Sequence, residues 1–587
     1  MIHGLQNELV TLGKKYRYLS FEYHQDSNAD CVDANLISII MNYRGVLSPL
    51  RRLPFEILSE IFLVYAEALI VNPDLEGHEQ DRGRGLAIRH QDLICQAQTG
   101  RSGPSVLAGV CRKWRSVALA TPHLWSQIVI SPESLSPTVR LDYLNSEILR
   151  RESYRSLSRD KIHRLFERRV KYSASLPLNI SMHYEKRAMS PVTQRLFKLI
   201  MSTANRWGSI RLNMPITDIP ENWISMPRWK INFQHLRNVD LVFSYASGRT
   251  PNALRHWFEN APNLTSVRWL RPLLINQESI LTFSLPWEQL THLEVDLSDE
   301  EVLVVLQRCK RLRNFKYHSD DNVIPWDGPS SMVHDTLESL SVLNGAVSWS
   351  YPRDGLETVL KNVSLPVLKN LTIEGPPPMR QFVSNNPTQY VDARLSSVLI
   401  IFIQHSQPLH LTTLTLNSIS VDKGFLDMIV QVSGTCSALS RVELDIRHLA
   451  GDTIQGRSEL AAQFIALLTV PGSSVQENVP AVLPRLKEFM LKFRCLTGDD
   501  EASCFSIDSL TRMVRSRRDA EFSISGVNRL EKFGLDYSYW NLPWVFKQEH
   551  VKQLRDLEND EFNLDFPERD PWLKYARSQE LLMNFIY

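Results

Sequence analysis

The residue types that most often catalyse reactions are present in this chain, but not in the spacings that build a known reaction centre. Its 16 histidines are dispersed, and no GxSxG, HExxH, GxxxxGK[ST] or strand-linked GxGxxG motif occurs. The seven cysteines form no CxxC pair, which indicates scattered thiols in a reducing compartment and no zinc site or disulfide framework. We therefore expect no catalytic residues, no cofactor and no bound metal.

Regularly spaced polar side chains suggest a different chemistry, the recognition of another protein. They lie inside a six-residue frame, apolar-x-x-apolar-x-apolar, which occurs ten times. Side chains alternate along a strand, so the third and fifth positions of the frame share one face. Both charge signs occur there, which favours a protein partner over nucleic acid. The candidate substrate-binding residues on this face are Asp240, Arg268, His292, Glu294, Lys316, Arg441 and Glu443.

The frame itself indicates how these residues are positioned. Its copies are LRNVDL (236–241), LTSVRW (264–269), LTHLEV (290–295), LRNFKY (312–317), LESLSV (337–342), LKNLTI (368–373), LTTLTL (411–416), LSRVEL (439–444), LKEFML (486–491) and LEKFGL (530–535). Successive copies begin 28, 26, 22, 25, 31, 43, 28, 47 and 44 residues apart. The shorter steps lie in or near the ~20–29 residues typical of a leucine-rich repeat, and the longer ones leave room for insertions.

A stack of such repeats predicts an α/β fold. One copy cannot bury its apolar side alone, but parallel strands stacked on one another can. Helix-period residues precede several frames, as at 254–258 and 302–306, so we expect a solenoid with strands on the concave face and helices on the convex face. A leucine-rich repeat usually has Asn or Cys three residues after the frame. No copy has Asn there, so we expect an irregular solenoid.

Two amphipathic segments precede the repeats. Within residues 47–69 the apolar side chains follow the spacing of one helix face, and Pro54 suits the first helical position. A second helix is predicted from Val106 to Ala120, where Thr121-Pro122 ends it. The polar, glycine-containing segment at about 71–104 is predicted to be a loop.

These segments resemble an F-box. The similarity rests on LPFEILSEIF (53–62), VCRKWR (110–115) and TPHLW (121–125), and it covers about a seventh of the chain. Together with irregular leucine-rich repeats, this order of motifs resembles the F-box-like proteins abundant in mushroom-forming fungi. The long insertion at about 71–104 departs from the family pattern.

The resemblance implies a substrate receptor of an SCF-type cullin ubiquitin ligase. The F-box would bind a Skp-type adaptor, and through it a cullin, while the repeats would bind a protein substrate. Carried over by position, the adaptor-binding residues would be Leu53, Pro54, Ile57, Leu58, Ile61, Phe62, Val110, Trp114, Leu124 and Trp125. Trp114 and Trp125 have an alternative interpretation, as core residues of the helical module itself.

Composition restricts the remaining alternatives. The chain has 587 residues with 66 Lys+Arg against 65 Asp+Glu, a balance that argues against binding nucleic acid or anionic membrane by bulk charge. No apolar run is long enough to span a membrane, and no signal peptide is visible, so we expect a cytoplasmic or nuclear protein. The main alternative function is an interaction scaffold whose F-box is degenerate or serves a complex without ubiquitin transfer. An enzymatic function is a weaker alternative.

The expected domain order follows from these observations. We predict an N-terminal helical or extended segment at 1–47, the F-box at 48–130, a helical linker at 131–170, the repeat solenoid at 171–545 and a C-terminal cap or tail at 546–587.

Overall fold

A computed structural model describes the parts of the chain discussed below. They are residues 53–68, 104–130, 159–183, 191–215, 232–244, 255–270, 280–319, 332–344, 354–374, 393–407, 409–449, 454–470, 481–493, 506–518, 527–536 and 563–565. The predicted segment at 1–47, the loop at about 71–104 and most of the linker and tail lie outside these residues. The chain divides into two compact units, Met1–Tyr184 and Glu185–Tyr587, which we call the N-terminal unit and the solenoid unit.

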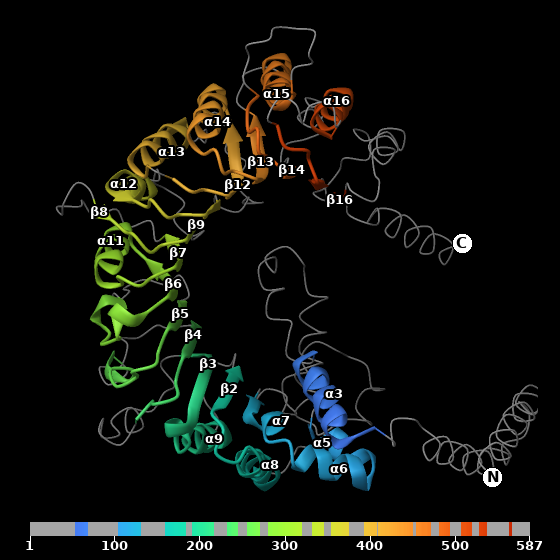
Figure 1. Ribbon diagram of the computed structural model, residues 1–587. Coiled ribbons are helices and arrows are strands. Elements are labelled where there is room, and N and C mark those ends of the chain that lie inside the picture. The colour runs from blue at the N-terminus through green and yellow to red at the C-terminus, as the bar shows by residue number, and fades with distance from the viewer. Residues whose placement is uncertain are drawn as a thin grey trace, which may run out of the picture. The chain divides into compact units, whose positions relative to one another are not determined.

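The N-terminal unit contains short helices and two strands (Figure 1). In chain order these are α3 (Phe55–Ala68), α5 (Pro104–Val110), α6 (Arg112–Leu119), α7 (His123–Ser126), β1 (Gln127–Ile130), α8 (Arg159–Tyr172) and β2 (Leu178–His183), with β1 and β2 parallel. The single helix predicted from Val106 to Ala120 is wrong. The chain breaks at Cys111, whose extended backbone ends α5 while its Sγ caps α6 by accepting a hydrogen bond from the Trp114 N–H at 3.4 Å.

The helices of this unit enclose a small core of their own. Its buried residues are Leu58, Phe62, Leu107, Val117, Ala118, Leu124 and Trp125. The Phe62 and Trp114 rings lie 4.9 Å apart between centroids, which joins α3 to α6, and Trp125 packs on Tyr172 of α8 at the same distance. The hydroxyls of Ser59 and Thr121 share a hydrogen bond of 2.9 Å, which fixes α3 against the end of α6.

The solenoid unit is a leucine-rich-repeat-like stack of parallel strands. Its strands are β3 (Trp207–Pro215), β4 (Asn238–Ser244), β5 (Ser266–Leu270), β6 (His292–Leu297), β7 (Asn314–Ser319), β9 (Ser339–Asn344), β11 (Asn370–Glu374), β12 (Thr413–Val421), β13 (Arg441–Leu449), β14 (Glu488–Phe493), β15 (Lys532–Asp536) and β16 (Asn563–Asp565). Each pairs in parallel with the next in this order, so the sheet follows the chain. Each of the ten sequence frames ends in one of the strands β4 to β15, which confirms the predicted repeats.

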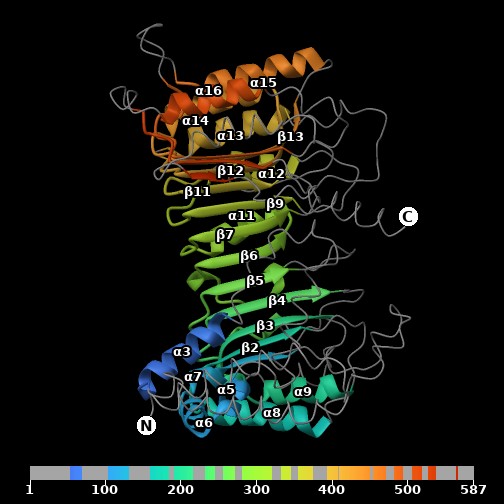
Figure 2. The same cartoon turned by 90° about the vertical axis from the view of Figure 1, so that its right-hand side faces the viewer.

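Helices cover one side of this sheet. They are α9 (Pro191–Met201), α11 (Asp299–Arg308), α12 (Asp354–Asn362), α13 (Ala393–His405), α14 (Lys423–Thr435), α15 (Ile454–Leu468) and α16 (Ile507–Arg518). Figure 1 shows α11 to α16 along the outer side of the solenoid unit and its strands along the inner side, and Figure 2 shows β4 to β12 side by side. A two-stranded pair, β8 (Met332–Val333) with β10 (Val363–Ser364), is separate from the main sheet. The helix-period segment expected at 254–258 is not an α-helix: Arg255 and His256 form a 3-10 turn followed by turn residues.

The frame explains the stack because its apolar positions form the core. The leading leucines of all ten copies, from Leu236 to Leu530, are 0–2% exposed. The fourth and sixth positions are equally buried, as with Val239 and Leu241 at 1% and 0%. Because this burial is shared between neighbouring repeats, no single repeat is stable without its neighbours.

Backbone hydrogen bonds join the starts of neighbouring strands. The carbonyl of the second frame residue accepts two backbone N–H groups from the next repeat. Thr265 O, for example, accepts from Thr291 N at 2.9 Å and from His292 N at 3.1 Å. The same pattern repeats from Arg237 to Glu531, and Thr291 Oγ1 adds a bond to Thr265 O at 3.2 Å. These backbone bonds align the starts of neighbouring strands in register.

Candidate functional site

An apolar surface lies on α3 and the end of α5. The predicted adaptor-binding residues that are exposed here are Pro54, Ile57, Ile61 and Val110, while Leu53 and Trp114 are half-buried. Ile57, Ile61 and Val110 are 48%, 42% and 55% exposed. The structure thus places these six residues where another protein can contact them.

The other four predicted adaptor-binding residues, Leu58, Phe62, Leu124 and Trp125, are at most 4% exposed. Here the expectation needs correction, because their side chains form the core of the N-terminal unit. Trp125 also donates its Nε1–H to the carbonyl of Ala118 at 2.7 Å, so its polar atom is used internally. These four residues hold the helices together and present almost no surface to a partner.

Three exposed apolar residues of the same helix are absent from the predicted adaptor-binding set. Phe55, Val64 and Tyr65 are 40%, 63% and 37% exposed. Ile57, Ile61, Val64 and Tyr65 follow the i, i+4, i+7, i+8 spacing of one helix face, and this spacing could have added Val64 and Tyr65 to the set. We call the set Ile57, Ile61, Val64 and Tyr65 the apolar face; Phe55 lies on another side of α3, and Val110 lies on α5.

Basic side chains of α6 lie close to the apolar face. Arg112, Lys113 and Arg115 are all exposed. Lys113 Nζ donates to the carbonyl of Leu53, next to the start of α3, at 2.7 Å, and Arg115 Nε donates to the carbonyl of Ala108 in α5 at 2.9 Å. These bonds hold two positive charges beside the helices that carry the apolar residues.

The second candidate surface is the side of the sheet that the helices leave uncovered, which we call the open face. The strand register aligns its residues in rows. One row begins Arg211, Asp240, Arg268, Glu294, Lys316, one residue from each of β3 to β7, with alternating charge.

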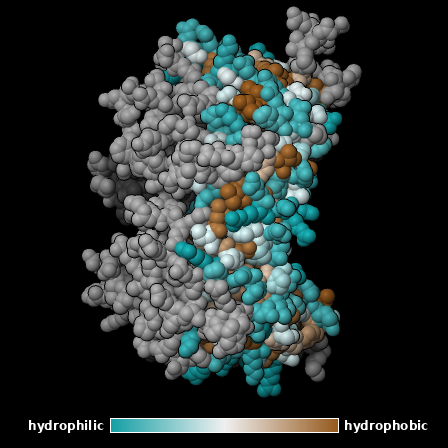
Figure 3. Space-filling model, turned by 90° about the vertical axis from the view of Figure 1, so that its left-hand side faces the viewer, coloured by the Kyte–Doolittle hydropathy of each residue, from teal (hydrophilic) through white to brown (hydrophobic). Residues whose placement is uncertain are grey.

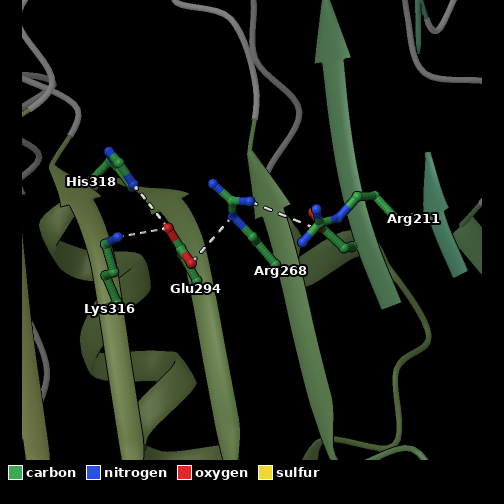
Figure 4. A network of polar contacts seen from close by, with 6 residues as sticks. Arg211, Arg268, Glu294, Lys316 and His318 are labelled. Carbon is green, nitrogen blue, oxygen red and sulfur yellow. Dashed lines mark hydrogen bonds and ion pairs between the residues drawn. The ribbon is translucent and has the colours of Figure 1, made fainter. Parts of the chain in front are cut away.

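Each charge in that row is paired with its neighbour (Figure 4). Asp240 Oδ2 lies 2.6 Å from Arg211 Nε and 3.6 Å from Arg268 Nη1. Glu294 continues the chain, with Oε2 at 3.2 Å from Arg268 Nε and Oε1 at 3.0 Å from Lys316 Nζ. We call this set the Glu294 network. Because each of these charges is already paired, a partner would have to compete with these pairs.

Glu294 is the centre of the network electrostatically. Burial alone would raise the pKa of Glu294, but the imidazole of His318 and the charges of Arg268 and Lys316 outweigh it and lower the pKa from 4.5 to about 2. The nearest His318 nitrogen, Nε2, is 3.6 Å from Glu294 Oε1. The carboxylate is therefore charged at any physiological pH.

A second network lies farther along the sheet, on β13 and β14. Glu443 Oε1 lies 2.6 Å from Lys492 Nζ, and Arg441 Nη1 lies 3.3 Å from Glu488 Oε2. Of the seven residues predicted to bind substrate, six therefore belong to ion pairs on the open face. The seventh, His292, is exposed and its Nδ1 contacts Thr291 Oγ1 at 2.8 Å.

The helix-covered side of the solenoid unit is a weaker candidate for a binding surface. Among its described residues only Val333 and Val430 are large, apolar and exposed, at 59% and 45%. Figure 3 shows this side with hydrophobic groups separated by hydrophilic ones.

One Ser–His–Glu arrangement occurs in the described residues, and its geometry does not fit nucleophilic catalysis. Ser284 Oγ lies 2.8 Å from His256 Nδ1, and Glu259 Oε2 lies 3.5 Å from the same nitrogen. A catalytic triad needs the two partners on different ring nitrogens. No group of three or more potential metal ligands occurs among the residues described. Of the described helices, none has the length and hydrophobicity to cross a bilayer.

Comparison with known proteins adds little. No family model matches the chain, and no curated protein matches it in sequence. Among solved structures it is similar to an internalin, inlF, from Listeria monocytogenes, at 11% identity with a TM-score of 0.26, over 68% of this chain and 83% of that chain. The solenoid description above therefore rests on the strand order, register and burial of this chain itself.

Proposed function

We propose that this protein is the substrate-receptor subunit of an SCF-type cullin ubiquitin ligase. In this proposal the N-terminal unit binds a Skp-type adaptor and, through it, a cullin. The solenoid unit binds a protein substrate by its open face, in the cytoplasm or nucleus.

The observation that carries the proposal is the apolar face. Six of the eight large apolar side chains that are exposed among the described residues lie on α3 and α5. Four of them, Ile57, Ile61, Val64 and Tyr65, share one side of α3 by their helical spacing, and clustered exposed apolar side chains usually mark an interaction site. Fully burying one such side chain contributes about 1.5–3 kcal/mol, so a partner covering several of them would gain substantial affinity.

Charged side chains of both signs surround the apolar residues. Arg112, Lys113 and Arg115 are exposed on α6, and Glu56 and Glu60 are exposed on α3. An interface typically has an apolar centre and a polar rim, so these side chains are candidates for the rim.

Pull-down of a Skp-type adaptor by the full-length chain tests the proposal. Ile57→Asp and Ile61→Asp should each reduce adaptor recovery at least about tenfold, because a charge in a desolvated interface centre is costly. Val430→Asp, on α14, makes the same substitution at an exposed apolar residue of the solenoid unit and should leave recovery unchanged. Equal recovery with all three variants would show that the apolar face does not bind the adaptor.

Recovery of a cullin separates the ligase from the alternative of a repeat scaffold without ubiquitin transfer. A receptor in a ligase should bring down both the adaptor and a cullin, and both should be lost together in Ile57→Asp. Adaptor without cullin would support the scaffold.

A further inference from the structure

A histidine occupies a buried position that is otherwise apolar along the solenoid unit. This position lies three residues before the leading leucine of each frame, in the turn that precedes the strand. The other described residues there are apolar and at most 9% exposed: Phe233, Ala261, Trp287, Cys309, Leu365, Cys436, Leu483 and Val527. His334, which follows β8, is 5% exposed, and its imidazole is the side chain that most readily changes charge near neutral pH.

The imidazole of His334 joins two consecutive repeats. Its Nε2 lies 3.0 Å from the carbonyl oxygen of Cys309, the residue that caps the C-terminal end of α11. Because a carbonyl oxygen can only accept, Nε2 carries the hydrogen and donates it. The same oxygen accepts the N–H of Leu312 at 3.0 Å. The His334 bond therefore ties the turn before β7 to the turn before β9.

Further hydrogen bonds extend this junction to the following repeats. The His334 N–H donates to the carbonyl of Ser364 at 3.0 Å, next to the pairing of β8 with β10. Ser364 Oγ in turn donates to the carbonyl of His405, the last residue of α13, at 2.8 Å. His334 is therefore part of a chain of hydrogen bonds from the end of α11 to the end of α13.

The second ring nitrogen of His334 is unsuited to carry a proton. Nδ1 is buried and has no hydrogen-bond partner among the described residues. A proton added there would leave a positive charge and an N–H without an acceptor inside the protein, which is costly. Burial therefore lowers the pKa of His334, although the bond to the Cys309 carbonyl and the charge of Asp335 act in the opposite direction.

The charged groups around the junction do not change this sign. On the described parts of the surrounding elements they are Asp335 beside His334, Arg308, Cys309 and Lys310 at the end of α11, Glu357 and Lys361 on α12, and His405 on α13. Asp335, Arg308, Lys310 and His405 are exposed, and Glu357 pairs with Lys361. Burial raises the pKa of the Cys309 thiol to about 12, so this group stays neutral. Of these groups, Asp335 favours a charged imidazole, and burial outweighs it.

We propose that His334 is a pH-sensitive latch between the β7 and β9 repeats. The neutral imidazole holds the end of α11 to the turn before β9, and uptake of a proton at Nδ1 in mildly acidic solution opens this junction. On the open face Lys316 of β7 stands opposite Ser341 of β9, so opening would disturb the surface beside the Glu294 network. The inference concerns the solenoid unit and does not depend on adaptor binding.

The direction of the pH dependence follows from proton linkage. Above pH of about 6.5 an exposed imidazole is neutral, as the buried one is, so the latch is fully closed. Below that pH the opened state binds a proton that the closed state does not bind. Opening then becomes more favourable by up to about tenfold for each pH unit.

Amide hydrogen exchange of the full-length protein at pH 7.5 and pH 5.5, read by peptide mass spectrometry and corrected for intrinsic rates, tests the latch. Wild-type peptides that cover residues 309–316 and 332–340 should lose up to about tenfold of their protection at pH 5.5. His334→Leu introduces the residue type that Leu365 provides in the next repeat, and its protection should change by less than about twofold. His235→Leu is the matched control. It makes the same substitution at an exposed histidine before β4 and should behave like the wild type.

Exchange of the imidazole C2 hydrogen, followed in the same peptides over a pH series, measures the titration of His334 itself. The titration midpoint in the native protein should lie below the midpoint in the urea-denatured chain. Two results would overturn the inference. One is an equal loss of protection in the wild type and His334→Leu, and the other is the same His334 midpoint in the native and the denatured chain. If His334→Leu lowers the melting temperature at pH 7.5, the imidazole measurement decides alone.

Discussion

Replacing Glu294 by glutamine should measure how much the Glu294 network stabilises the solenoid unit. The pKa of Glu294 falls from 4.5 to about 2, and at about 1.36 kcal/mol for each pKa unit this corresponds to about 3 kcal/mol. The side chain is 22% exposed, so solvent screening reduces the contribution, and we expect Glu294→Gln to cost about 2 kcal/mol at neutral pH. Lys316 would lose the carboxylate at 3.0 Å from its Nζ, and Arg268 would lose the carboxylate at 3.2 Å from its Nε.

The sign of the pH dependence follows from the lowered pKa. A carboxylate whose pKa is lower in the folded state stabilises the protein fully above its unfolded pKa and loses that contribution as pH falls through its folded pKa. The difference between wild type and Glu294→Gln should therefore be constant from neutral pH to about pH 5, shrink below about pH 4.5 and approach zero near pH 2.

Urea unfolding at a series of pH values measures this difference from the midpoints and slopes. Glu338→Gln is the matched control. Glu338 also pairs with a lysine, Lys369, at 2.7 Å, but its side chain is 35% exposed and the pair lies at the surface, so the midpoint should hardly move. Equal effects of the two substitutions, or a Glu294→Gln effect that does not shrink in acid, would refute the reasoning.

Three further predictions concern side chains of the core. Leu58→Ala should destabilise the N-terminal unit by about 3 kcal/mol, because the Leu58 side chain is 0% exposed. Ile57→Ala should cost less than about 0.5 kcal/mol, because Ile57 is 48% exposed; thermal unfolding measures both. Arg517→Met should cost about 3 kcal/mol in urea, because the 2%-exposed guanidinium donates to three backbone carbonyls that would lose their donors. Burial raises the pKa of Cys309 to about 12 and of Cys436 to about 11, so iodoacetamide at pH 8 should leave both unlabelled in the native protein, read by peptide mass spectrometry.

The repeat frame was predictable from sequence because each copy carries its own burial pattern. In the frame of β6, Leu290 just before the strand and Leu293 and Val295 within it are predicted to be buried, and all three are. The strand β3 has the same pattern in Trp207, Ile210 and Leu212, all at most 1% exposed. A search for frames that begin with leucine misses the β3 copy, although another large apolar residue can fill the same buried position.

Periodicity could not separate core from exposed surface on α3. Leu58 and Phe62 are buried, whereas Ile57 and Ile61 are exposed, and all four follow one apolar spacing of four residues. A helix with apolar residues over most of its circumference reveals its core only when its neighbours are known. The break at Cys111 was missed for a similar reason. The helical spacing of apolar residues continues from Val110 to Trp114, although the helix itself is interrupted at Cys111.

The open face shows why strand register, more than residue type, limits what a sequence can reveal about binding. Four residues of the Glu294 network were identified individually and Arg211 was not, but the pairing requires Asp240, Arg268 and Glu294 to stand opposite one another across three strands. A one-residue shift would turn all of them toward the core. Where charges already pair across strands, as in the Glu294 network, a partner must replace those pairs, so selectivity depends on the groups that the partner offers in exchange.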